Sequence, residues 1–276
     1  MAMRTLFGWT SYPPAVFNET GTPQIMRGLP GKFIEFNKSL SERFDEMLPA
    51  EFRVDGQAHF REEFAPPHIS KGALVYDVGG GKHPLFSREE KARCGLRVVG
   101  LDIDEGELLR APCGVYDATI RADITRYRGR EDADVVICQA LLEHVDDTPA
   151  ALAGLASILQ KGGVALLFTP SKNSLYARVN LLLPVKLKRK LLRLLYPELA
   201  DKSGFPGRYH RCTLSDFEEM AHGQGFAVIR KKAYFYSGYF SFFAPLHVLW
   251  RVWLWVFYLL SRERAAETFS MALRKK

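Results

Sequence analysis

Three aspartates stand where short apolar runs of the chain end. Asp77 lies two positions before the glycine turn at residues 79–81, Asp102 ends the run VVGLD, and Asp123 ends the run TIRAD. Ligands of open α/β sheets bind beyond the carboxyl ends of the strands, and glycine lets a backbone approach a ligand closely. The three acids and the turn therefore predict a cofactor site at one edge of a sheet.

The types and order of these residues indicate an adenosine cofactor. An acid at the end of the second strand can accept hydrogen bonds from a ribose diol, and one at the end of the third can accept from the exocyclic amine of adenine. A NAD site also begins with a glycine turn, but its third glycine would fall at Pro84. Two alternatives remain open: Asp77 merely caps the turn, or Asp102 serves NAD.

The surrounding pattern predicts a doubly wound α/β domain. Short, nearly continuous apolar runs alternate with helical stretches, as expected for strands that are covered on both faces. The predicted strands are residues 74–78, 97–102, 118–123, 135–138, 164–169, 226–236 and 267–275. Helices are predicted at 33–48, at 149–159 with a stop signal at Lys161-Gly162-Gly163, and at 214–225 with Ser215 as the cap.

These motifs resemble those of class I S-adenosylmethionine (SAM) dependent methyltransferases. The run DVVICQALLEHV at residues 134–145 is similar to the stretch after which that family often shows Glu-His-Val. The resemblance implies a Rossmann-like fold with a seven-stranded, mostly parallel sheet and an antiparallel last strand. It also implies SAM as the cofactor, with S-adenosyl-L-homocysteine as the product.

The resemblance assigns cofactor roles residue by residue. Asp77, Gly79, Gly80 and Gly81 would shape the pocket and hold the methionyl end, where Lys82 stands in place of the family's small residue and contacts the carboxylate. The ribose would be held by Asp102 with Ile103 beside it, the adenine by Asp123 and Ile124, and the sulfonium side would be lined by Gln139 and Ala140.

The sequence offers two candidates for a general base and no metal site. His210 and His144 have side chains whose usual pKa lies near neutrality. His210 is equally well interpreted as a surface loop residue, and His144 as a packing residue at the start of a helix. The four cysteines are scattered without metal-binding spacing, which favours a reducing cytoplasm.

The domain organisation that we expect is an N-terminal helical cap, residues 1–71, followed by a methyltransferase domain, residues 72–276. Two insertions interrupt that domain, at about 174–212 and 238–262. The first contains a basic amphipathic stretch at 176–195, and the second an apolar, tryptophan-rich stretch at 238–260. The chain carries a formal net charge of +7, which suits an anionic partner.

A membrane-spanning role is not predicted for residues 238–260. A spanning helix needs about 20 apolar residues, and the part after Pro245 is shorter. Both ends of the insertion also return to strands of one sheet. We therefore expect peripheral contact with the inner face of a membrane through 176–195 and 238–260, with a hydrophobic lid or a dimer interface as alternatives. The oligomeric state is left open.

The function predicted from the sequence is O-methylation of an amphipathic, lipid-linked or glycan-linked acceptor at a membrane surface. The stretch 204–213 resembles bacterial methyltransferases that act on lipid-linked or polysaccharide-linked sugars. Alternatives are a soluble small-molecule methyltransferase, a NAD-dependent oxidoreductase, and a non-catalytic protein that binds a partner. Nucleic-acid methylation is disfavoured because Gln139-Ala-Leu-Leu stands where such enzymes carry an Asn/Asp-Pro-Pro-Tyr loop.

Overall fold

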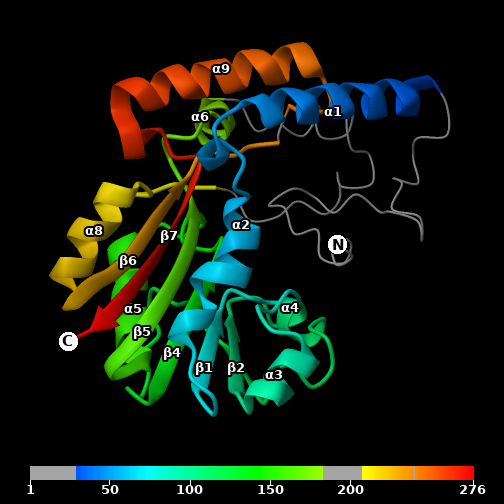
Figure 1. Cartoon of the computed structure of the whole chain (residues 1–276). Coiled ribbons are helices and arrows are strands. Elements are labelled where there is room, and N and C mark those ends of the chain that lie inside the picture. The colour runs from blue at the N-terminus through cyan, green and yellow to red at the C-terminus, as the bar shows by residue number, and fades with distance from the viewer. Residues whose placement is uncertain (1–28, 183–206, 239) are drawn as a thin grey trace.

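The fold is a seven-stranded sheet with helices on both faces (Figure 1). The structure, a computed structural model, describes residues 29–182, 207–238 and 240–276. The strand order is β3-β2-β1-β4-β5-β7-β6. The strands are β1 (Leu74–Val78), β2 (Arg97–Asp102), β3 (Ala118–Arg121), β4 (Ala133–Gln139), β5 (Leu159–Pro170), β6 (Phe226–Tyr234) and β7 (Thr268–Lys275).

Strands β1 to β5 pair in parallel, and β7 lies antiparallel between β5 and β6. The predicted fold class is therefore confirmed, including the antiparallel last strand. The order reverses between β1 and β4, which are neighbours in the sheet although β2 and β3 come between them in the chain. This is the position at which doubly wound sheets bind their ligands.

Each face of the sheet is covered by its own apolar cluster. On one face, α5 (Thr148–Ile158) and α8 (Leu214–Gly223) bury residues such as Leu155 and Phe217 against Leu167 and Phe269. The other face is covered by α2 (Gly56–His59), η2 (Phe60–Phe64), η3 (Pro66–His68) and α3 (Arg88–Cys94). The sheet is thereby removed from water on both sides, as its continuous apolar runs require.

Three helices lie beyond the carboxyl ends of β4, β5 and β6 (Figure 1). They are α1 (Leu29–Met47), α6 (Leu175–Leu182) and α9 (Ala244–Ser261). Helix α9 passes the length and composition test for a membrane span over Ala244–Ala265, the only helix among the described residues to do so. The remaining short elements are η1 (Ala50–Phe52), α4 (Glu105–Leu109) and η5 (Arg262–Ala265).

Several predicted boundaries were wrong. Helix α5 ends at Ile158 and β5 begins at once, so Lys161-Gly162-Gly163 lie inside a strand that bulges between its pairings to Ala133 and Val135. Thr213 and not Ser215 caps α8, because its Oγ1 accepts from the backbone N–H of Asp216. Strand β3 ends at Arg121, two residues before Asp123. The basic part of the first insertion, residues 183–206, lies outside the described residues.

Candidate functional site

The loop after β1 has room only for glycine. Gly79 and Gly81 have backbone φ angles of +77° and +47°, in the region that favours glycine. A Cβ at Gly79 would lie 2.8 Å from the side chain of Leu141, and a Cβ at Gly80 would lie 2.6 Å from the carboxyl group of Asp77. The glycine loop therefore packs against Leu141, in the loop after β4, and against the carboxyl group of Asp77.

Asp77 supports this loop from inside the protein. Its side chain is buried, and Oδ2 accepts a hydrogen bond from the backbone N–H of Leu85 at 3.0 Å. The Tyr116 hydroxyl lies 3.4 Å from the same oxygen and 3.1 Å from the carbonyl oxygen of Gly81. Burial raises the pKa of Asp77 to about 6, opposed mainly by the Leu85 hydrogen bond. Asp77 thus shapes the glycine loop.

Asp102 lies directly beside the glycine loop. A Cβ on Gly81 would stand 3.2 Å from Asp102 Oδ2, while Oδ1 accepts from the backbone N–H of Asp104 at 3.0 Å. Burial raises the pKa of Asp102. The next side chain, Ile103, is apolar and 50% exposed. A carboxylate with one oxygen toward the loop and an exposed apolar neighbour suits a ribose and the base attached to it.

Asp123 and Ile124 follow β3 and lie at the same edge of the sheet as Asp102. The backbone N–H of Ala122 donates to the carbonyl of Asp102 at 2.9 Å, which places Asp123 next to the second strand. Asp123 Oδ1 accepts from the backbone N–H and the hydroxyl of Thr125, and its side chain is 37% exposed. Ile124 is 4% exposed and packs in the core against α5, so its side chain is not available to a ligand.

Lys82 has a protein partner in this structure. Its Nζ lies 3.2 Å from Glu107 Oε2, and Glu107 also pairs with Arg110 at 2.5 Å. Glu107 was not a sequence candidate, because it stands 25 residues from Lys82 on α4. It lies against the glycine loop, since a Cβ on Gly81 would be 3.0 Å from Glu107 Cβ. Lys82 is thus held at the rim of the loop.

The end of β4 carries a strained residue and a buried amide. Ala140 has a φ of +47°, which is uncommon for a residue with a Cβ, and its N–H donates to Phe168 at 2.8 Å. Gln139 Oε1 is buried and has no hydrogen-bond partner among the described residues. A buried acceptor of this kind is unfavourable unless a ligand satisfies it. Gln139, which the sequence places beside the sulfonium of SAM, therefore offers a ligand an unused hydrogen-bond acceptor.

A buried glutamate that sequence reasoning missed lies four residues after Gln139. Glu143 is 3% exposed, its Oε2 has no hydrogen-bond partner among the described residues, and its Oε1 lies 3.7 Å from His144 Nε2. Burial raises its pKa to about 7, with His144 acting in the opposite direction. Its position within the apolar run ALLEHV was the signal that could have identified it.

Two backbone contacts join Glu143 to the loop that carries His210. The N–H groups of Arg208 and Tyr209 both donate to the Glu143 carbonyl, at 2.7 and 2.9 Å. Tyr209 and Arg211 have φ angles of +51° and +49°, so the loop is strained where it meets the β4 end. The His210 side chain is exposed, and its carbonyl accepts a hydrogen bond from the Thr148 hydroxyl. Both candidate histidines therefore lie on loops that are bonded to each other.

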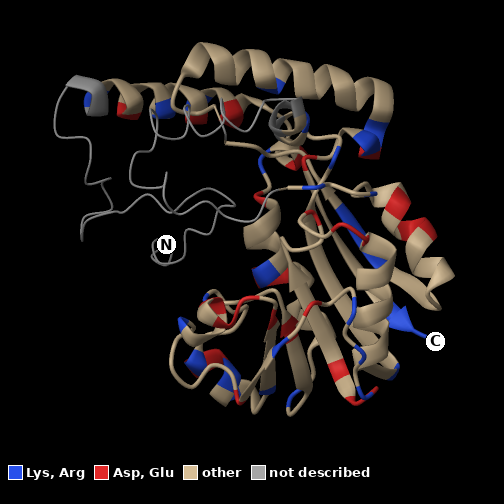
Figure 2. Cartoon of the chain, turned by 180° about the vertical axis from the view of Figure 1, so that it is seen from behind, with Lys and Arg blue, Asp and Glu red and all other residues tan. Residues whose placement is uncertain are grey.

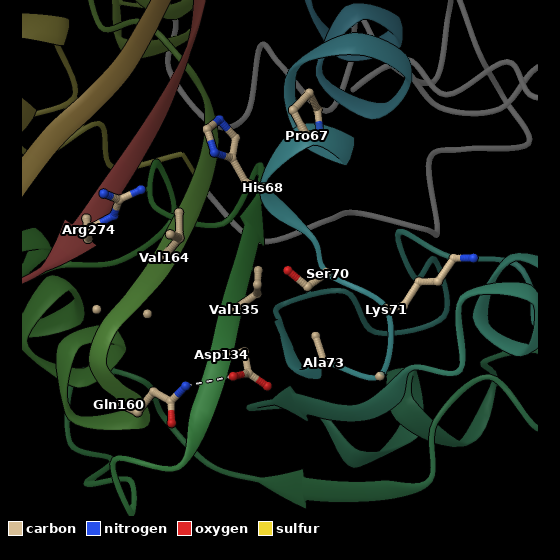
Figure 3. Close-up of a pocket in the computed structure, with 13 residues that line it drawn as sticks. Pro67, His68, Ser70, Lys71, Ala73, Asp134, Val135, Gln160, Val164 and Arg274 are labelled. Atoms are coloured by element: carbon tan, nitrogen blue, oxygen red, sulfur yellow. Dashed lines mark hydrogen bonds between the residues drawn. The ribbon is translucent and has the colours of Figure 1, made fainter.

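A cavity of about 410 Å³ lies at the opposite, amino-terminal edge of the sheet (Figure 3). It is lined by residues that precede β1, by the beginnings of β4 and β5, and by Arg274 of β7. Asp134 there is fully bonded, because it accepts from the Leu74 N–H and from the Gln160 amide. This cavity contains none of the predicted cofactor residues, which gather at the carboxyl edge.

Glu143 predicts a specific pH dependence of stability. Its folded pKa of about 7 exceeds the ordinary 4.5, so the fold favours the protonated form and loses stability as pH rises through 7. The variant Glu143→Gln has no ionisable group at this position, so it does not lose this stability as the pH rises. We expect the variant to gain up to ~3 kcal/mol in free energy of unfolding relative to wild type between pH 5 and pH 8, measured by urea unfolding. The exposed Glu62→Gln serves as the control, and a difference that is constant with pH would contradict the burial of an ionisable Glu143.

Comparisons with known proteins identify a methyltransferase domain in the chain. A sequence model of the methyltransferase domain family matches residues 50–231. The ubiquinone biosynthesis O-methyltransferases of Stutzerimonas stutzeri and Hahella chejuensis are 29% and 33% identical over 121 and 109 residues, which cover 41% and 37% of this chain. The matched region spans about half the length of these relatives, 51% and 45%.

A solved structure shows the same fold. The SAM dependent methyltransferase of Archaeoglobus fulgidus superposes with a TM-score of 0.50 at 16% identity, covering 85% of this chain and 99% of that protein. The family match extends over well more than half of the chain and includes the glycine loop, Asp77 within β1, Asp102 at the end of β2 and Asp123 after β3. The chain belongs to the methyltransferase domain family, and it has the fold of a SAM dependent methyltransferase.

Proposed function

We propose that this methyltransferase transfers a methyl group to a hydroxyl of an amphipathic acceptor, lipid-linked or glycan-linked, at a membrane surface. The observation that carries the proposal is helix α9, which lies beyond the carboxyl edge of the sheet and exposes only uncharged side chains between Leu246 and Leu260 (Figure 1). An acceptor with an apolar part would approach the edge along such a surface.

The residues at this edge fit SAM. Asp102 Oδ2 would face the ribose hydroxyls, Ile103 the plane of the base, and the glycine loop the methionyl end. Asp123 Oδ1 is engaged by Thr125 and Oδ2 lies 4.0 Å from Arg126 Nε, so Oδ2 is the oxygen that would turn to the adenine amine. When bound, SAM supplies an activated methyl group whose reactivity belongs to the cofactor. The protein's part is to align the acceptor and remove a proton.

A histidine beside the end of β4 is the group that we propose takes the acceptor's proton. His144 follows Gln139 by five residues and lies 3.7 Å from the buried carboxyl of Glu143, which can stabilise an imidazolium. His210 is the second candidate, because its loop is bonded to the Glu143 backbone. His144 is favoured over His210 by its partly buried position next to an acid.

The names of the relatives support an acceptor of this class. The matched curated proteins are named for O-methylation in ubiquinone biosynthesis, although the chain covers only about half of their length. We infer a cytoplasmic location on the inner face of the membrane. All four cysteines are free, which suits a reducing compartment.

The ribose contact predicts the effect of Asp102→Asn. The amide keeps the hydrogen bond from the Asp104 N–H but loses the charge that strengthens bonds from ribose hydroxyls. We expect SAM and S-adenosylhomocysteine to bind about 10- to 100-fold more weakly, by calorimetry. Asp134→Asn, at the opposite edge, should leave both affinities unchanged. Equal affinities for wild type and Asp102→Asn would remove Asp102 from the cofactor site.

The proposed base predicts a loss of turnover without a loss of cofactor affinity. We expect His144→Ala to lower kcat about 100-fold, with SAM affinity near that of the wild type. His210→Ala tests the second candidate in the same way. His222→Ala, an exposed histidine on α8, is the matched control. If neither His144→Ala nor His210→Ala changes kcat, neither of these histidines takes the proton.

The acceptor class can be measured with methyl-labelled SAM. We expect label to enter the chloroform-soluble fraction of a lipid and glycolipid extract, and the labelled product to carry a methyl ether. A panel of soluble phenols and sugars is the comparison. Label in soluble compounds alone would instead indicate a small-molecule methyltransferase with a hydrophobic lid.

A further inference from the structure

Helices α1 and α9 contact each other through polar side chains. Asn37 Oδ1 accepts from the Ala244 N–H at 2.9 Å, and the Ser41 hydroxyl donates to the Ser241 carbonyl at 3.1 Å. Asn37 and Ser41 are 4% and 1% exposed. One turn further along α1, Asp45 continues the same row. The side of α1 that faces α9 is thus polar and buried.

Asp45 binds the two ionisable residues of α9. Its Oδ1 lies 3.0 Å from His247 Nε2 and 2.8 Å from Arg251 Nε. Arg251 also donates to the carbonyl of Phe235, at 2.7 Å, and to that of Phe52. His247 and Arg251 are both fully buried. All of the ionisable side chains of α9 therefore point into the protein.

The opposite side of α9 is apolar and open to the surroundings. Its exposed large side chains are 39% to 80% accessible, and they are Leu246, Leu249, Val252, Trp253, Trp255, Val256, Leu259 and Leu260. Figure 2 shows this helix almost without charged residues along its length, in contrast to α1. A helix at a protein–water boundary has the reverse arrangement, with its polar residues outside.

Helix α1 shows the inversion along one strip of its surface. Phe33, Phe36 and Leu40 are 56%, 63% and 38% exposed and Asn37 and Ser41 are buried, while Glu35 and Glu42 are among the charged side chains that α1 also exposes. Helices that pack by polar contacts and turn apolar side chains outward are typical of a lipid environment, where apolar contact between helices gives no advantage over contact with lipid. The arrangement is unfavourable in water.

We propose that the outer face of α9, with its neighbour α1, docks onto an anionic lipid bilayer and lies in the plane of its surface. The in-plane position follows from topology. Tyr234 of β6 pairs with Thr268 of β7, so both ends of the α9 segment return to one sheet on the same side of the membrane. A helix of 18 residues is about 27 Å long, and tryptophans are favoured at the depth where headgroups meet acyl chains.

Charge at the border of the face favours a bilayer over a second copy of the chain. Arg262 and Arg264, both exposed, follow the C-terminal end of α9, and the exposed Glu263 between them is paired with Lys231. Helix α6, which carries the exposed Arg178, lies beside α9 in Figure 1. Arg178 of α6 lies 5.5 Å from the ring of Phe257 on α9, which connects the two helices. Basic groups beside an apolar face bind anionic headgroups, whereas two copies of the chain would bring like charges together.

This inference rests on the proposed function in one respect. An amphipathic acceptor dissolved in the bilayer would reach the carboxyl edge of the sheet without passing through water. Docking itself can be tested without an acceptor, because it concerns only α9 and lipid.

The test uses the full-length chain and vesicles of phosphatidylcholine, with and without phosphatidylglycerol. We expect the wild type to float with the anionic vesicles and to bind neutral ones at least 10-fold more weakly. The double variant Leu249→Glu/Leu260→Glu places charges at positions that are 69% and 80% exposed, so it should keep the wild-type Tm and SAM affinity in lipid-free buffer. We expect it to bind anionic vesicles at least 10-fold more weakly. Leu109→Glu, at an equally exposed leucine on α4, is the matched control and should bind as the wild type does.

Three results would overturn the docking surface. They are a wild type that floats with neither vesicle, a double variant that floats as well as the wild type, and a lipid-free wild-type dimer that the double variant converts to a monomer. The last result would make the face a contact between copies. Vesicle binding that depends on Leu249 and Leu260, together with no methyl transfer to any extracted lipid, would support the docking surface and overturn the proposed acceptor class instead.

Discussion

The glycine loop depends on a carboxyl group that the fold buries beneath it. The Asp77 carboxylate accepts a hydrogen bond from the Leu85 N–H at the far end of the loop. The Tyr116 hydroxyl donates to this carboxylate and to the Gly81 carbonyl. Gly80 must lack a Cβ because Asp77 occupies the space. The shape of the proposed cofactor site therefore follows from one buried acid, and the neighbouring acid Asp102 is positioned by the strand pairing of β1 with β2.

The unfavourable features of this protein gather at the carboxyl edge. Ala140, Tyr209 and Arg211 are three of the five non-glycine residues with positive φ among the described residues, and the buried Glu143 and Gln139 each leave an oxygen without a partner there. At the amino edge the acid of β4 is fully bonded, whereas His68 Nε2 is buried without a partner in the part of the chain that the structure describes and Glu131 has a positive φ. Strain and unsatisfied polar groups are retained where a ligand compensates for them. Their greater number at the carboxyl edge favours that edge as the position of the proposed cofactor site.

The sequence predicted the parts of the fold that local pattern determines. Continuous apolar runs gave the positions of β1 and β2, and the acids at their ends pointed to the edge where Asp102 meets the glycine loop. Contacts between distant residues were not predictable in this way. The pairing of Lys82 with Glu107, the burial of Glu143 and the polar contact of α1 with α9 across about 200 residues all depend on tertiary packing. The glycines at 162–163 misled because a bulged strand can contain them.

The orientation of α9 is set by the hydrogen bonds of Arg251 together with the packing of Leu254 in one apolar cluster with Phe52 and Phe235. A buried guanidinium is strongly unfavourable unless its donors are satisfied, and Arg251 is satisfied by Asp45 and by the carbonyls of Phe52 and Phe235. Rotating α9 to bury its leucines would withdraw Arg251 from all three partners. The apolar side of α9 therefore has to face outward as long as Arg251 is in place. A surface fixed in this way is favoured in an apolar environment, so the polar interior of the α1–α9 pair supports the membrane docking that we propose.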